Sequence, residues 1–243
     1  MGDVLKIINK SDYNKLGILA DVNLHDKVFE EFKTLKLNKK SKILILGAGK
    51  GVFDKKLLDL GYLNITAVDL NKKDYSLKSK VNFVKFDLNK DFSKKFKNYD
   101  VIFAMEIIEH LKSPLNFVKN CYASLNKKGI FIITTPNILE FSYRLKTTFR
   151  SELPSFNSQA MLSYGHILPI LPHILEKFLL DYNFNILKKT YNRTFFDFLI
   201  VESWKSYLQF IIFSIIYLIF WLLNIKDKYP GVIRIYVAQK VDY

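Results

Sequence analysis

The sequence contains little cysteine and few acidic residues, and each shortage bears on the class of protein. Cys121 is the only cysteine in 243 residues, which excludes a disulfide framework and a zinc site built from several cysteines. The first residues, Met1 to Lys6, contain no apolar segment, so we expect no secretory signal and a cytoplasmic location. A hydrophobic content of 49% excludes a disordered chain and predicts one well-packed core.

The shortage of acidic residues makes the chain strongly basic. Lys and Arg number 37 against 23 Asp and Glu, which gives a formal net charge of +14. A basic surface could attract nucleic acid, anionic lipid or a phosphorylated substrate. The lysine excess could equally reflect base composition, since Asn, Ile and Phe are also abundant. Charge alone therefore does not identify a partner.

Glycine is also scarce, but three of the nine glycines lie close together. Residues 43–47 predict a buried strand, and residues 52–60 predict a helix. Between them, Gly47, Gly49 and Gly51 let the backbone turn sharply, so that free N–H groups at the helix start can face a nucleotide-like ligand. The spacing is G-x-G-x-G, and Val52 stands where the dinucleotide-binding fingerprint has its third glycine.

Strands and helices alternate through most of the chain, which predicts a parallel sheet with helices on both faces. Asp69 and Asp87 end two of the strands, at the sheet edge where a carboxylate can accept ribose hydroxyl groups or meet an adenine. The predicted strands are 43–47, 65–69, 81–87, 99–105, 130–135, 185–193 and 231–240, and the predicted helices are 21–37, 52–60, 114–125 and 174–182.

A cluster of polar residues follows the strand at 99–105. Glu106, Glu109 and His110 are spaced i, i+3, i+4, so on a helix they would share one face beside the ligand crevice. Two carboxylates and an imidazole, with His166 as a fourth ligand, could hold Mg²⁺ or Mn²⁺. Alternatively, His110 is a general base without a metal, or the two glutamates cap a helix and His110 is structural. We expect His25 to be a surface or lid residue.

Taken together, these motifs resemble class I methyltransferases that use S-adenosylmethionine, in the branch of ubiquinone-pathway O-methyltransferases and surface-glycan enzymes. The match covers about residues 35–192 and the last strand. It departs from the family at Ile45, two positions before the first glycine, where the family often carries an acidic residue. The motifs, in family order, are the G-x-G-x-G turn, Asp69, Asp87, Asp100-Val-Ile, Glu106-Ile-Ile-Glu-His-Leu, Lys127-Lys-Gly-Ile-Phe-Ile-Ile-Thr-Thr-Pro-Asn137 and Gly165-His166.

The resemblance implies a Rossmann-like α/β fold with a mostly parallel seven-stranded sheet. It also supports the metal interpretation, because ubiquinone-pathway and small-RNA 2′-O-methyltransferases use an E-x-x-E-H face for a metal ion. It implies S-adenosylmethionine as cofactor, bound by Gly47, Gly49, Gly51, Asp69, Asp87 and Met105.

The predicted chemistry is methyl transfer to a hydroxyl group, with His110, Glu109 and His166 as candidate catalytic residues. The expected acceptor is a small molecule: a surface-polysaccharide glycan, a lipid-linked intermediate or a quinone precursor. One alternative is RNA 2′-O-methylation, although the apolar segment described next makes a nucleic-acid partner less expected. Another is a membrane-attached binding protein with a degenerate cofactor site, which Ile45 would favour.

An apolar segment interrupts the pattern near the end of the chain. Residues 207–223 contain no charged side chain and would form a helix about 25 Å long, shorter than the ~30 Å hydrocarbon core of a bilayer. A single membrane crossing would put the strands 185–193 and 231–240 of one sheet on opposite sides. Residues 204–228 therefore lie on the inner face of a membrane, form a shallow re-entrant hairpin in it, or pack against the domain or a second subunit in a homodimer.

These observations predict a division of the chain. Residues 1–40 form an N-terminal helical lead-in, and residues 41–200 with 229–243 form the methyltransferase domain. Residues 201–228 form an apolar helical insertion before the last strand, and residues 138–172 are expected to build the substrate lid.

Overall fold

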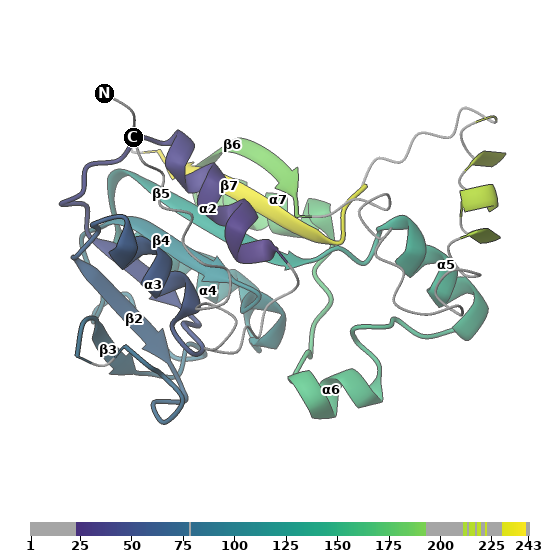
Figure 1. The fold of residues 1–243 in the computed structure, drawn as a ribbon, viewed down its shortest axis with the longest axis horizontal. Helices are drawn as coiled ribbons and strands as arrows, with labels where there is room; N and C mark the ends of the chain where they lie inside the picture. The colour runs from purple at the N-terminus through teal and green to yellow at the C-terminus, as the bar shows by residue number, and fades with distance from the viewer. Residues whose placement is uncertain are drawn as a thin grey trace.

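A seven-stranded sheet with the order β3-β2-β1-β4-β5-β7-β6 forms the centre of the molecule (Figure 1). The computed structural model describes residues 23–77, 79–192, 211–212, 214–216, 218–219, 222 and 230–241. Strands β1 to β5 are parallel, and β7 runs antiparallel to β5 and β6. The predicted Rossmann-like, mostly parallel sheet is confirmed. The strands are β1 (Ile43–Leu46), β2 (Ile65–Asp69), β3 (Asn82–Lys85), β4 (Tyr99–Met105), β5 (Leu125–Pro136), β6 (Phe184–Tyr191) and β7 (Ile233–Lys240).

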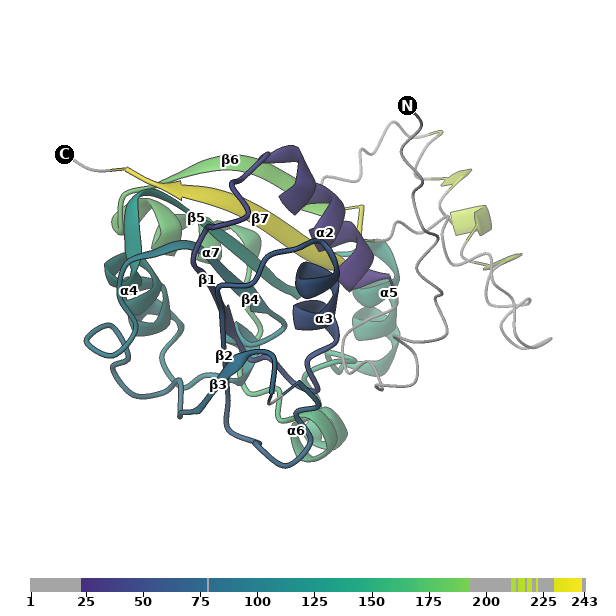
Figure 2. The same ribbon diagram turned by 60° about the vertical axis from the view of Figure 1, so that its left-hand side comes forward.

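Helices cover both faces of the sheet. α2 and α3 lie on one face and α4 and α7 on the other, while α5 and α6 lie beyond the end of the strands (Figures 1 and 2). The helices are α2 (Leu24–Thr34), α3 (Val52–Asp59), the 3₁₀ turn η1 (Ile108–His110), α4 (Pro114–Ser124), α5 (Phe141–Arg150), α6 (Ser158–Tyr164) and α7 (Pro172–Asp181).

Two hydrophobic cores fill the space between the sheet and these helices. Ile43 and Ile45 of β1 belong to the core under α2 and α3, whereas Leu44 and Leu46 belong to the core under α4 and α7. Successive side chains of a strand point to opposite faces, so a central strand covered on both sides is apolar throughout. Burying each such side chain contributes about 1.5–3 kcal/mol. The ends of the central strands are therefore firmly positioned.

Most element boundaries agree with the sequence, and β5 is the main exception. β2 and β4 begin and end as predicted, while α2 and β3 are shorter than predicted. Residues 126–129, which separate the predicted helix 114–125 from the predicted strand 130–135, instead extend β5 back to Leu125, which pairs with Tyr99 before a register shift. Asn126 Nδ2 donates to Asp100 Oδ1 at 2.7 Å, so a partner on β4 supports this extension.

The strands on either side of the predicted insertion, β6 and β7, pair with each other. Most of the apolar segment, with Trp204, Lys205, Lys226 and Lys228 around it, lies outside the described residues. Its described residues, between 211 and 222, are helical. Within the part of the chain that the structure describes, no helix has the length and apolar character to cross a membrane.

Candidate active site

A cavity of about 770 Å³ lies at the carboxyl ends of β1, β2 and β4. The glycine turn, Asp69, His110 of η1 and several residues between 143 and 166 line it. This is the edge at which open α/β sheets bind their ligands. Met105, at the end of β4, and Ile45, the departure from the family pattern, also line the cavity.

The glycine turn requires glycine at its first and last positions. Gly47 and Gly51 have φ angles of 77° and 87°, in the left-handed region that favours glycine. A Cβ atom at Gly47 would lie 3.0 Å from Cδ1 of Ile107, and one at Gly51 would lie 3.0 Å from Cε2 of Tyr75. The backbone can therefore approach a ligand and its neighbours closely only because these side chains are absent.

Asp69 joins the glycine turn to the end of β2. Its Oδ2 accepts from the Gly49 N–H at 2.8 Å, and its Oδ1 accepts from the Asn71 N–H at 2.9 Å. A carboxylate has about four lone-pair directions, so both oxygens can still accept hydroxyl groups of a ligand. The geometry suits the predicted binding of a ribose.

Asp87, by contrast, does not line the cavity. It follows β3 in a turn, where its Oδ1 accepts from the N–H of Asn89 at 2.9 Å and from Nδ2 of Asn89 at 3.1 Å. These hydrogen bonds lower the pKa of Asp87. The structure therefore brings Asp69 and Met105, but not Asp87, to the cavity.

Glu109, His110 and His166 form a polar cluster with one potential ligand atom from each residue, all within 4.8 Å of one another. Nδ1 of His110 lies 3.1 Å from the Gly165 carbonyl oxygen, and Nδ1 of His166 lies 2.8 Å from the Ser155 carbonyl oxygen. Because a carbonyl only accepts, Nδ1 of each ring carries a hydrogen, and in the neutral form of the ring the lone pair is on Nε2. Backbone hydrogen bonds of this kind orient histidines that bind metal ions.

Glu109 is the buried member of the cluster. Its Oε2 accepts from the Thr135 hydroxyl at 3.1 Å, and its Oε1 has no hydrogen-bond partner among the described residues. Burial raises the pKa of Glu109 to about 8. The backbone carbonyl of Glu109 accepts from the N–H groups of Ile167 and Leu168, which holds the His166 segment over η1.

The donor set fits a divalent cation. One carboxylate oxygen and two imidazole nitrogens suit Mn²⁺ better than Mg²⁺, which prefers oxygen ligands. The unpartnered Oε1 of Glu109 is a buried polar atom that a cation would satisfy.

The predicted single helical face for the E-x-x-E-H motif is wrong. Glu106 has a φ angle of 50°, and only Ile108–His110 form a 3₁₀ turn. Oε1 of Glu106 accepts from the Thr134 hydroxyl at 3.0 Å, and Glu106 lies outside the three-residue cluster, although it lines the cavity.

Several cavity residues were missed by the sequence analysis. His25, expected at the surface or in a lid, lines the cavity from α2, and its buried Nδ1 has no partner in the described chain. Burial, followed by the charge of Lys56, lowers the pKa of His25 to about 4, so this ring is neutral. Ser155 and Ser163 line the cavity from the lid, beside Tyr143. No local pattern marks these positions, because α2 and residues 138–172 come to the same cavity only in the fold.

Comparison with known proteins gives consistent results. A profile described as a methyltransferase domain matches residues 22–189. The ubiquinone biosynthesis O-methyltransferase of Rickettsia typhi is 29% identical over 141 residues, which cover 53% of this chain and 56% of that protein. The chain spans about half the length of the curated relatives it matches.

Two solved structures share the fold at low sequence identity. An S-adenosylmethionine-dependent methyltransferase from Archaeoglobus fulgidus has a TM-score of 0.60 and 18% identity, covering 88% of this chain and 93% of that one. Magnesium protoporphyrin IX methyltransferase from Synechocystis, solved with S-adenosylhomocysteine, has a TM-score of 0.58 and 12% identity, covering 95% and 93%.

Proposed function

Since this chain belongs to the methyltransferase-domain family, we propose that it transfers a methyl group from S-adenosylmethionine to a hydroxyl oxygen of a small-molecule acceptor. One observation carries the proposal. A single cavity contains Asp69, hydrogen-bonded to the glycine turn, and the histidines of the Glu109–His110–His166 cluster. On this proposal, the residues that would bind the cofactor and those that would activate a hydroxyl group face the same space.

The residues at one side of the cavity fit the cofactor. Asp69 would accept the ribose hydroxyls, the turn from Gly47 to Gly51 would face the ligand with its backbone, and Met105 would contact it. When bound, the cofactor supplies a methyl group already activated by the sulfonium charge. The protein then has to hold the acceptor oxygen in line, and such positioning can supply about 7–11 kcal/mol at most.

The cluster can activate the acceptor in two ways. Burial, followed by the charge of His166, lowers the pKa of His110, so its ring is neutral near neutral pH and can take the hydroxyl proton on Nε2. A divalent cation held by Glu109, His110 and His166 would instead lower the pKa of the hydroxyl group. The unpartnered oxygen of Glu109 favours the second arrangement.

The lid supports an acceptor with a flat ring or a sugar. Tyr143 and Tyr164 contribute aromatic surface, Ser155 and Ser163 contribute hydroxyl groups, and Ile233 contributes apolar surface to the cavity wall. This combination suits a quinone precursor, a glycan or a lipid-linked intermediate. The names of the curated relatives favour the quinone class.

Peripheral membrane contact is a second part of the proposal. Within residues 211–222 most of the described aliphatic side chains are exposed, and Leu222 is 67% exposed, whereas Ile216 is half-buried. Lys205, Lys226 and Lys228 flank this segment, and the net charge of +14 would attract anionic lipid. A homodimer contact would cover the same side chains.

The proposed division of the chain places residues 201–228 as an insertion between β6 and β7, and residues 1–40 as a lead-in to the domain.

Calorimetric titration with S-adenosylhomocysteine tests the cofactor site. We expect micromolar binding by the wild-type protein and a loss of about 100-fold in Asp69→Ala, because two charge-assisted hydrogen bonds to the ligand disappear. Asp87→Ala is the matched control, since this strand-end aspartate lies outside the cavity, and its affinity should stay within about three-fold. Absence of binding by the folded wild-type protein would overturn the proposal.

The acceptor class needs a separate measurement. Transfer of labelled methyl groups to catechols, sugars and short RNA oligonucleotides, with and without anionic vesicles, distinguishes the quinone, glycan and RNA alternatives. We expect product with a catechol or a sugar and none with RNA. Product with RNA alone would contradict the small-molecule proposal.

A further inference from the structure

Asp54 is a buried carboxyl group that the proposed chemistry does not use. It lies in the first turn of α3, directly after the glycine turn, and its side chain is fully buried. Oδ1 accepts from the Tyr75 hydroxyl at 2.8 Å, and Oδ2 has no partner among the described residues. A carboxyl group with so few partners is costly to bury, so an apolar residue would suit stability better.

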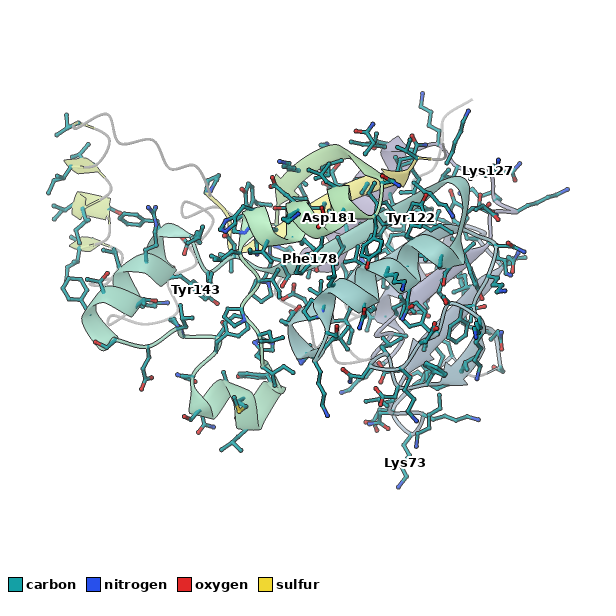
Figure 3. The ribbon with its side chains drawn as sticks, turned by 180° about the vertical axis from the view of Figure 1, so that it is seen from behind. Lys73, Tyr122, Lys127, Tyr143, Phe178 and Asp181 are labelled. Carbon is teal, nitrogen blue, oxygen red and sulfur yellow. The ribbon has the colours of Figure 1, made fainter. Side chains whose placement is uncertain are left out.

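Tyr75 anchors the segment that joins β2 to β3. Among residues 71–76 it alone is buried, and the others are exposed. Figure 3 shows Lys73 of this segment pointing away from the protein. The Tyr75 ring packs against Phe83 with a centroid distance of 4.5 Å and contacts Gly51. The segment has no helix or strand of its own, and Tyr75 is its one buried side chain among residues 71–76.

The same segment is connected to the ligand-facing backbone. The Ser76 N–H donates to the Lys50 carbonyl at 3.3 Å, and Asp69, just before the segment, accepts from the Gly49 N–H. Asp54, Tyr75 and Ser76 therefore link the start of α3, the glycine turn and the β2–β3 connection into one unit. Neither Asp54 nor Tyr75 lines the cavity.

We propose that Asp54 and Tyr75 are positioning residues that hold the glycine turn and the β2–β3 connection in the arrangement that binds the ribose and adenine of the cofactor. The inference rests on the proposed function, because it assumes that an adenosine ligand binds beside Asp69. Hydroxyl contacts at Asp69 depend on the Gly49 N–H, and hence on the position of the turn.

The ionisable groups near Asp54 are consistent with a positioning role for this residue. Tyr75 faces Asp54 from the β2–β3 connection, and Asp69 faces it from β2. Burial raises the pKa of Asp54 to about 7, the Tyr75 hydrogen bond opposes this, and the nearby Asp69 adds to it. An asparagine at this position would keep an oxygen acceptor for Tyr75 without a charge. The acceptor, rather than the charge, is therefore expected to matter.

The test compares Tyr75→Phe, Asp54→Leu and Asp54→Asn with the wild-type protein. The matched control is Tyr62→Phe, which removes a hydroxyl group that donates to the Leu37 carbonyl at 3.1 Å, away from the cavity. Each protein is titrated with S-adenosylhomocysteine, melted in a thermal scan, and analysed by hydrogen exchange of residues 70–81.

We expect Tyr75→Phe and Asp54→Leu to bind about 10-fold more weakly and to exchange faster over residues 70–81. Asp54→Asn should retain affinity within about three-fold, and Tyr62→Phe should bind as the wild type does. Unchanged affinity and exchange in Tyr75→Phe, or an equal loss in Tyr62→Phe, would overturn the inference. If the wild-type protein does not bind, the proposed function fails, and unchanged exchange would separately show that Tyr75 holds nothing.

Discussion

At the scale of single residues, Glu109 separates the two ways in which the site could activate a hydroxyl group. Its Oε1 is buried without a partner in the described chain, beside two histidines whose Nδ1 atoms are oriented by carbonyl groups. A metal-free base needs only the imidazole of His110. A cation needs the Glu109 carboxylate as well, so replacing this carboxylate with a neutral side chain distinguishes the two mechanisms.

We predict that Mn²⁺ binds the wild-type protein and binds Glu109→Gln about 10- to 100-fold more weakly, because a charged ligand becomes a neutral amide. Electron paramagnetic resonance of free Mn²⁺ measures both affinities. Glu106→Gln is the control, since Glu106 bonds to Thr134 outside the cluster, and it should bind Mn²⁺ like the wild type. Equal Mn²⁺ affinities for all three proteins, or no Mn²⁺ binding by the wild-type protein, would contradict the cation mechanism and favour His110 as a metal-free base.

The parts of the site whose local structure the sequence predicted well are those that depend only on neighbouring residues in the chain. The G-x-G-x-G spacing and the strand-end Asp69 need only a strand, a turn and a helix in succession, and all three formed as predicted. Glu106 was misplaced because its hydrogen bonds with Thr134 come from the neighbouring strand β5, and its left-handed φ angle ends any helical pattern. His25 was missed because α2 reaches the cavity only through tertiary packing.

At the scale of elements, α6 leads directly into the polar cluster. Asn157 caps this helix, with its Oδ1 accepting from the Ala160 N–H at 2.9 Å. The helix ends at Gly165, whose carbonyl faces His110, and His166 follows. A short helix with one capping side chain at its start therefore leads into both the carbonyl that faces His110 and the His166 segment.

We predict that Asn157→Ala destabilises α6 by about 1 kcal/mol without unfolding the domain. Hydrogen exchange of residues 158–165 should accelerate, Mn²⁺ affinity should fall, and the affinity for S-adenosylhomocysteine should not change. Asn38→Ala is the control, because Asn38 caps a turn far from the lid, with its Oδ1 accepting from the Lys40 N–H. Slow exchange in Asn157→Ala would show that α6 does not depend on its cap.

The order of strands and helices was predictable because each hydrophobic run is bounded by polar or glycine residues. The exception, β5, shows the limit of such patterns. The sequence predicts that the helix ends at residues 126–129, but Leu125 pairs with Tyr99 and Asn126 bonds to Asp100, so these residues belong to β5. The neighbouring strand β4 extends β5 in this way, and a pattern of adjacent residues carries no information about a neighbouring strand.

At the scale of the whole molecule, buried ionisable groups connect the site to stability. Burial raises the pKa of Asp54 to about 7 and of Glu109 to about 8, against about 3.9 and 4.3 in an unfolded chain. The folded state therefore binds more protons than the unfolded state between these values. The stability that these carboxyl groups contribute is present at low pH and is lost as the pH rises through about 7 to 8.

His25 changes stability with pH in the opposite direction to the two carboxyl groups, and it does so at lower pH. The pKa of His25 is lowered to about 4, so its contribution is present above its unfolded value of about 6.5 and is lost as the pH falls below it. Above about pH 6.5 an unfolded histidine loses most of its proton, so the two carboxyl groups should dominate the slope of stability against pH up to about pH 8.

We therefore predict that the melting temperature, measured with EDTA present, falls as the pH rises from about 6.5 to about 8. The double variant Asp54→Asn, Glu109→Gln should show a flatter dependence, because neither site can then release a proton. Asp87→Asn is the control: hydrogen bonds from Asn89 lower the pKa of Asp87, so it is ionised throughout this range and should leave the slope unchanged. A wild-type melting temperature independent of pH would mean that these two carboxyl groups are hydrated or paired in solution. The buried Asp54–Tyr75 and Glu109–Thr135 contacts would then not describe the folded state.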